Sequence, residues 1–127
     1  MQKLFWTSIF ICSITLAPHV QAKDGAYFLK ACEAAVKQAD GAQLTLEDSL
    51  SAINCMTYIS GFREALALSS KISKTPKLYC PPEGGVTNEQ VARVFTKFLR
   101  SNSDSLSQNG SLSLYIALAN NYPCAGS

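Results

Sequence analysis

Residues 80–90 read CPPEGGVTNEQ and contain the clearest helix start in the chain. Two prolines and two glycines form a turn, Thr87 follows as the N-cap, and Gln90 stands three positions later. This spacing is typical of a capping box, in which each side chain binds the backbone N–H of the other residue. Val86 and Val91 flank the cap as a hydrophobic staple. The pattern therefore predicts a helix that begins directly after Thr87.

The segment after this cap has one apolar face. Its apolar residues follow the helical spacing i, i+3, i+4, i+7 and i+8, at Val91, Val94, Phe95, Phe98 and Leu99. Such a stripe is typical of a helix that packs against a core. Residues 101–105 interrupt the pattern and separate this helix from the next one.

A last helix is expected from about residue 105 to Asn121, where Pro123 ends it. Leu112, Tyr115, Ile116 and Ala119 share one face, and two further leucines lie beside it. The apolar arc is therefore wide enough for burial on two sides. A dimer interface or a deep core position would each account for it.

The first half of the chain predicts two more helices. One covers about residues 26–38, and the other starts after Thr45, with Asp48 in the capping-box position, and runs to about Ser69. Gly61 lies within the second helix and costs about 1 kcal/mol relative to Ala, which close packing of another helix would offset. With no strand candidate longer than a few residues, the expected fold is all-α, with four helices in two hairpins.

Residues 1–22 have the features of a signal peptide. Lys3 gives a positive start, residues 4–17 are mainly apolar, and Val20-Gln21-Ala22 supplies small residues for a peptidase. The apolar run is too short and too interrupted for a membrane anchor. We therefore expect cleavage after Ala22, export to the periplasm, and a single mature domain over residues 23–127.

The mature domain would retain four cysteines, at positions 32, 55, 80 and 124. An even number in a small exported domain indicates two disulfides, whereas a Cys₄ zinc site normally needs close cysteine pairs that are missing here. Cys32 and Cys55 lie about 10 and 14 Å from the connected ends of the first two helices, so an antiparallel hairpin brings them level. Cys80 and Cys124 flank the second helix pair at its open end. The expected bridges are Cys32–Cys55 and Cys80–Cys124.

Charge and histidine content exclude several functions. Removal of Lys3 with the leader leaves ten basic and nine acidic residues with no basic stripe, so a nucleic-acid partner is not expected. The leader also carries His19, the only histidine. Its loss excludes Ser-His-Asp and Cys-His catalysis and histidine metal sites. We expect a protein with no enzymatic activity, no cofactor and no metal.

Several short motifs occur in a characteristic order between residues 28 and 124. They are Cys55-x-x-Tyr58-Ile59-x-Gly61-Phe62, Cys80-Pro81, Gly85-Val86-Thr87-x-x-Gln90-Val91, Phe98-Leu99 followed by Asn102, and Ala117-Leu118 before Tyr122-Pro123-Cys124. In these motifs the chain resembles the Rap1a/Tai immunity proteins, small exported helical proteins found with type VI secretion amidase toxins. The chain departs from the family pattern at Asn102-Ser103, where Asn-Pro is frequent, and at Ser107 or Gln108, where a charged residue or histidine is frequent.

The resemblance implies a periplasmic protein that occupies the cleft of a peptidoglycan amidase, often as a homodimer. No association with a membrane is expected after leader cleavage. The expected contact surface is either the loop 101–105 or the turn 83–85. The residues expected to contact the partner are Glu83, Gly84, Gly85, Asn102, Ser103 and Asp104. A periplasmic chaperone-like or stress protein with the same helices and no toxin partner is the alternative. A neighbouring gene for a small secreted amidase would favour the first interpretation.

Overall fold

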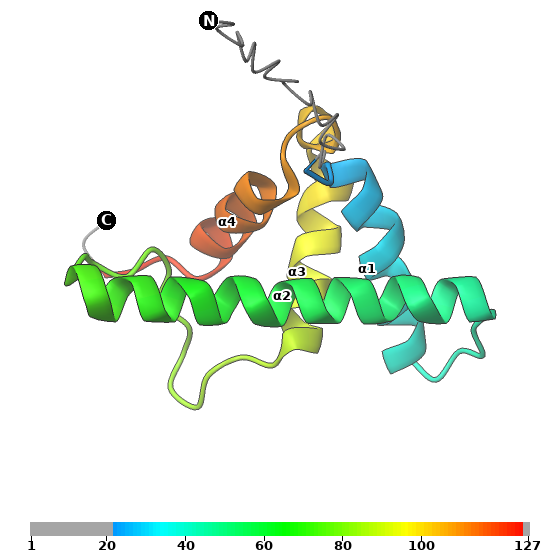
Figure 1. Cartoon of the computed structure of the whole chain (residues 1–127), viewed down its shortest axis with the longest axis horizontal. Helices are drawn as coiled ribbons and strands as arrows, with labels where there is room; N and C mark the ends of the chain where they lie inside the picture. The colour runs from blue at the N-terminus through cyan, green and yellow to red at the C-terminus, as the bar shows by residue number, and fades with distance from the viewer. Residues whose placement is uncertain (1–21, 126–127) are drawn as a thin grey trace, which may run out of the picture.

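The computed structural model describes residues 22–125, so the expected leader lies outside the described residues except for Ala22. The elements are α1 (Gly25–Ala39), α2 (Leu46–Ser73), α3 (Asn88–Ser101), the 3₁₀ helix η1 (Ser103–Leu106) and α4 (Gly110–Asn121). In Figure 1, α2 runs across the whole molecule, and α1 and α3 cross it steeply. Over the described range the fold is all-α, as predicted, with only an isolated bridge between Asp24 and Asn109.

The helix starts are fixed by side-chain caps. Thr45 Oγ1 accepts a hydrogen bond from the Asp48 amide at 3.1 Å. At α3 the Thr87 hydroxyl accepts from the Gln90 amide at 3.1 Å, and the Thr87 amide donates to Gln90 Oε1 at 2.8 Å. The capping box predicted from the sequence is therefore confirmed, and it satisfies amide groups that would otherwise be unpaired at the first turn.

Helix α3 supplies the centre of the core. Its side chains Val91, Phe95 and Leu99 are completely buried, whereas Val94 and Phe98 are partly buried. The surrounding helices contribute the other fully buried apolar side chains, among them Cys32, Ala52, Cys55, Ile59, Leu114 and Leu118. Of the apolar stripe predicted from the sequence, one side is thus buried in the core and the other side lies at the edge of the core.

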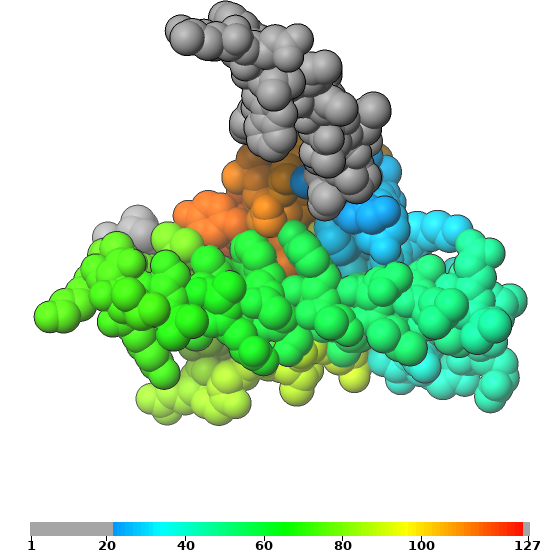
Figure 2. Space-filling model, viewed as in Figure 1, coloured from blue at the N-terminus to red at the C-terminus, as the bar shows by residue number. Residues whose placement is uncertain are grey.

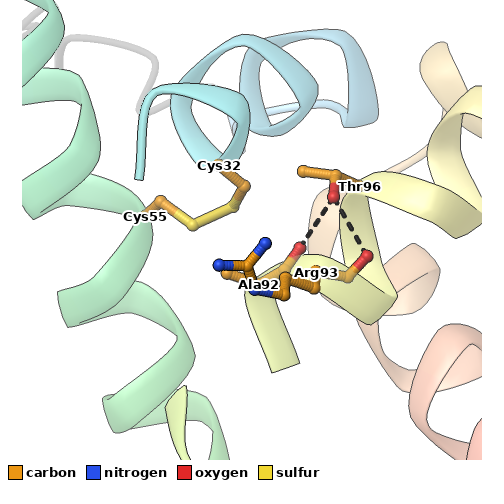
Figure 3. The surroundings of a disulfide bond; sticks show 5 residues. All are labelled: Cys32, Cys55, Ala92, Arg93 and Thr96. Atoms are coloured by element: carbon orange, nitrogen blue, oxygen red, sulfur yellow. Dashed lines mark hydrogen bonds between the residues drawn. A yellow bond between two sulfur atoms is a disulfide. The ribbon is translucent and has the colours of Figure 1, made fainter. Parts of the chain in front are cut away.

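The disulfide Cys32–Cys55 joins α1 to α2 beside α3, as Figure 3 shows. Its Cα atoms are 5.1 Å apart, and both cysteines are completely buried. On the neighbouring turn of α3, the Thr96 hydroxyl donates to the carbonyl oxygens of Ala92 and Arg93 at 3.0 Å, so this buried polar group is satisfied. The predicted pairing is confirmed, and three helices meet at this point.

The start of α4 differs from the sequence prediction. The helix begins at Gly110 and not near residue 105, because η1 and a short turn occupy the intervening residues. A Cβ at Gly110 would lie 2.2 Å from the Phe28 ring, and the Gly110 amide donates to the Lys23 carbonyl at 2.9 Å. The close approach to α1 therefore sets where α4 starts.

The buried face of α4 also differs from the expected one. The fully or nearly fully buried residues of this helix are Gly110, Ser113, Leu114, Ala117 and Leu118. Leu112 is 49% exposed, and Tyr115, Ile116 and Ala119 are only partly buried. The contact at Gly110 rotates α4 so that the neighbouring edge of its wide apolar arc enters the core.

Helix α2 is much longer than the core that it covers. Its buried residues are Ala52, Cys55 and Ile59, and the 14 residues that follow Ile59 include none that is buried. At about 1.5 Å per residue this extension reaches roughly 20 Å beyond the core. No atom lies within 4 Å of the position of a Cβ at Gly61, so no other helix packs there. The helix ends at Ser73, and the C-cap residue Lys74 has a left-handed backbone (φ 51°) that turns the chain out of the helix.

Candidate functional site

The turn at residues 83–85 leads directly into α3. The Gly85 amide donates to the Pro82 carbonyl at 2.9 Å, and Gly84 and Gly85 have φ values of 89° and 76°. These left-handed conformations favour glycine, which explains the Gly-Gly pair. Glu83 is exposed at the tip of the turn. The turn is thus a surface feature with a fixed backbone.

The second expected contact region, residues 102–104, lies at the other end of α3. Asn102 Nδ2 donates to the Phe98 carbonyl at 2.7 Å and so closes the last turn of the helix. Ser103 and Asp104 form the start of η1, and all three residues are exposed. Because the 14 residues of α3 separate this region from the turn 83–85 by about 20 Å, the two regions form separate surfaces.

The second disulfide, Cys80–Cys124, ties the C-terminal segment to the connector between α2 and α3. The Cα atoms are 4.9 Å apart, and the Cys80 amide donates to the Tyr122 carbonyl at 2.8 Å. The rings of Tyr79 and Tyr122 lie beside this bond, with centroids 6.4 Å apart. The predicted pairing is confirmed, and both cysteines are only partly buried.

Arg63 links α2 to the connector and to α3. Its Nη2 donates to the Val86 carbonyl at 2.8 Å, its Nη1 donates to Asn88 Oδ1, and its Nε donates to Tyr79 Oη at 3.4 Å. All three partners are neutral oxygens, and none of the described carboxylates forms a salt bridge with this guanidinium. Because these partners lie 16 to 25 positions away in the chain, no local sequence pattern indicates the contacts.

Tyr58, on α2, lies at the edge of the core. Its ring lies against Phe28, with centroids 4.1 Å apart, and near Phe62 at 6.3 Å. Burial raises the pKa of its hydroxyl above the ordinary value, and a hydrogen bond from Ser111 opposes this shift. Its surroundings are those of a packing residue.

A groove of about 490 Å³ lies between the extension of α2 and residues 75–81. Its apolar walls come from Leu66, Ala67, Pro76, Leu78, Tyr79 and Pro81. Arg63, Lys71 and Lys77 also line it, and no acidic residue does. Figure 1 shows the connector running back alongside the end of α2 that extends beyond the other helices and then passing below α2 to reach α3.

The sequence alone did not reveal this groove. The available signal was that residues 65–82 contain three lysines and no acidic residue, while apolar residues continue through the end of α2. The groove requires in addition that α2 outreach the core and that the chain return alongside it. Both conditions depend on tertiary structure.

At the opposite end of α2 the charges are paired. The salt bridges are Lys30–Glu47 at 3.0 Å, Arg100–Glu33 at 2.8 Å, Arg93–Asp40 at 2.6 Å and Arg93–Glu89 at 2.9 Å. The hydrogen bond from Arg93 lowers the pKa of Asp40, and the hydrogen bond to Glu47 raises the pKa of Lys30. Most of the carboxylates near this end are thus paired with basic side chains of the protein.

Within residues 22–125, no group of three or more His, Cys, Asp or Glu side chains could hold a metal ion. All four cysteines of this range form disulfides, so the zinc alternative is excluded. None of the helices in the described part combines the length and apolarity that a membrane span requires.

Comparison with known proteins completes this description. No curated protein and no solved structure matches the chain. The model of one family, described as Rap1a immunity proteins, matches residues 24–124. This range spans all four helices, both disulfides, the turn 83–85 and the groove. The chain therefore belongs to the family of Rap1a immunity proteins.

Proposed function

We propose that this protein is a periplasmic immunity protein that binds a peptidoglycan amidase toxin of a type VI secretion system and blocks its active-site cleft. The observation that carries the proposal is the family match over residues 24–124. Membership of an immunity family supports a toxin protein as the partner, and inhibition by occlusion requires no catalytic group in the inhibitor.

The fold supports this role because it offers a preorganised surface. A rigid inhibitor loses little conformational entropy on binding, so more of its contact energy appears as affinity. Two disulfides, the capped start of α3 and the Arg63 hydrogen bonds fix the surface around the connector.

The proposed compartment is the periplasm, reached through the leader at residues 1–22. Two disulfides in a mature domain of about one hundred residues are typical of an oxidising environment. N-terminal sequencing of the protein from a periplasmic extract tests the proposal. A first residue of Lys23 supports it, and an intact N-terminus in the cytoplasm contradicts it.

Co-purification tests the immunity function. The probe is a small secreted peptidoglycan amidase of a type VI secretion system from the same organism, with its catalytic cysteine replaced by alanine so that cells survive its expression. We expect a stable complex, and loss of peptidoglycan cleavage when the protein is added to the active amidase. Absence of binding at micromolar concentration, together with suppression of aggregation of unrelated proteins, would instead support the chaperone-like alternative.

We also propose that the protein acts as a homodimer. On α2, Leu46, Leu50 and Ile53 are 78%, 54% and 57% exposed at the spacing i, i+4, i+7, which places them on one helix face. Figure 2 shows α2 along the front of the molecule. Light scattering of the purified protein tests this proposal. A dimer that dissociates in the double variant Leu50→Ser/Ile53→Ser supports it, and a monomeric wild-type protein contradicts it.

A further inference from the structure

The groove between α2 and the connector has the form of a binding site. Its volume of about 490 Å³ lies within the range of ligand-binding clefts, and its walls are mainly apolar. Leu78 is 51% exposed at its edge, and Leu66 is half-buried within it. Apolar side chains gathered in an open concave surface favour a partner that covers them.

The groove also carries positive charge that no carboxylate in the described part of the chain neutralises by a salt bridge. Lys71 and Lys77 are exposed and form no ion pair in the described part of the chain, and Arg63 is held by neutral oxygens alone. A concave apolar surface strengthens the field of such charges because it excludes water. Its complement is an apolar group accompanied by negative charge.

Both walls of the groove are fixed before any partner binds. Arg63 joins α2 to the Val86 carbonyl, and the Cys80–Cys124 bridge anchors the connector to the C-terminal segment. The Cys80 amide also donates to the Tyr122 carbonyl at 2.8 Å. Partner binding therefore has a low cost of ordering on this side of the interface.

We infer that this groove is the toxin-docking site, and that it receives an apolar side chain flanked by carboxylates on the surface of the toxin. The inference rests on the proposed function and specifies its partner surface. A concave groove suits a protruding side chain better than it suits a flat lipid bilayer. Pro81 lines the groove only two positions before Glu83, so the turn 83–85 continues the same contact surface.

The charge arm of the test uses the double variant Lys71→Glu/Lys77→Glu. Binding to the inactive amidase is measured by surface plasmon resonance with full-length mature protein. We expect affinity to fall about 100-fold, since two attractions become repulsions. The matched control is Lys37→Glu/Lys97→Glu, which makes the same change of net charge at exposed lysines of α1 and α3 and should leave affinity within about threefold.

The apolar arm compares two leucines of similar exposure. Leu78→Ser removes a groove side chain and should weaken binding about tenfold, whereas Leu112→Ser on α4 should change it little. Thermal unfolding monitored by circular dichroism verifies that all variants remain folded. Substitution at these exposed positions should alter the unfolding temperature only slightly.

The outcomes separate this inference from the function on which it rests. Failure of the wild-type protein to bind the amidase overturns the proposed function, and the inference with it. Wild-type affinity in both groove variants overturns the inference alone, as does an equal loss in the control variants. Sedimentation with vesicles of phosphatidylglycerol and phosphatidylethanolamine adds a further outcome: groove-dependent vesicle binding, with toxin affinity unchanged, would assign the groove to a membrane surface.

Discussion

The two ends of helix α2 differ in how their charge and apolar surface are satisfied. Near its N-terminus, α2 is bonded through Cys55 to a completely buried disulfide, and the neighbouring helices carry the salt bridges of the described chain. Near its C-terminus, an apolar groove is open to solvent and its lysines are unpaired within the described range. The first end (the closed end) leaves only the apolar face of Leu46, Leu50 and Ile53 for a second copy of the chain, whereas the second (the open end) offers an apolar groove with unpaired lysines. Under the proposed function, the first end maintains the fold and the second end contacts the toxin.

The largest effect should come from the two disulfides. The loop closed by Cys80–Cys124 is about twice as long as that closed by Cys32–Cys55, which favours the longer loop by only about 0.6 kcal/mol. Replacing the completely buried pair with alanine also removes well-packed side chains, which costs about 1–2 kcal/mol more. We therefore expect losses of about 4.5–5.5 kcal/mol for Cys32→Ala/Cys55→Ala and about 4 kcal/mol for Cys80→Ala/Cys124→Ala.

Urea unfolding of both double variants measures these losses. The reverse order would mean that chain entropy in the unfolded state outweighs packing. The closed end would then contribute no more to the free energy of unfolding than the open end. The Cys80–Cys124 variant should also lose amidase binding, since this bridge anchors one wall of the groove.

Substitution of two phenylalanines tests the same contrast through packing alone. Phe95 is completely buried in the core, and Phe62 is partly buried on α2 beyond the last buried residue of that helix. Phe95→Ala should lower the free energy of unfolding by about 3–5 kcal/mol, and Phe62→Ala by about 1–2 kcal/mol. Equal losses in urea unfolding would show that the packed region extends further along α2 than burial indicates.

The features that the sequence predicted correctly depend on short-range patterns or on helix geometry. The capping box at Thr87 involves residues only three positions apart, and the pairing of Cys32 with Cys55 follows from their heights on two connected helices. The start of α4 was placed wrongly because it depends on contact between Gly110 and Phe28, which are distant in sequence.

The candidate site was predicted less well than the fold. The turn 83–85 could be recognised from Pro and Gly residues, but the groove beside it requires α2 to extend past the core. Gly61 illustrates the difficulty: the sequence suggested that another helix packs there, whereas the structure leaves that position open to solvent. How far a helix extends beyond its core depends on the lengths of its neighbours, which no local pattern contains.

Substitution of two arginines should lower the free energy of unfolding by smaller amounts, and the amounts should differ between Arg63 and Arg100. Arg63 is partly buried and donates to three oxygens, so Arg63→Gln should cost about 2 kcal/mol by leaving the Val86 carbonyl and Asn88 with fewer donors. Arg100 forms an exposed salt bridge with Glu33, so Arg100→Gln should cost less than about 1 kcal/mol. Thermal and urea unfolding of the two variants measures the difference. Comparable losses would contradict the view that the Arg63 contacts fix the walls of the groove.

The smallest effect concerns pH and the paired charges at the closed end. The hydrogen bond from Arg93 lowers the pKa of Asp40 in the folded protein, so ionised Asp40 stabilises the fold above its unfolded pKa of about 3.9. This contribution is lost as pH falls below about 4 and through the lower folded pKa. Asp40→Asn should therefore reduce stability at neutral pH and flatten the decline of stability in acid.

Asp104→Asn is the control, because no salt bridge involves Asp104 in the described range. Sodium chloride at about 1 M should reduce the difference at neutral pH between wild type and Asp40→Asn, since Asp40 and Arg93 are both exposed enough to be screened. An unchanged acid profile in Asp40→Asn would mean that Arg93 is held by Glu89 alone, and that the closed end owes its stability to the disulfide and the core without help from this salt bridge.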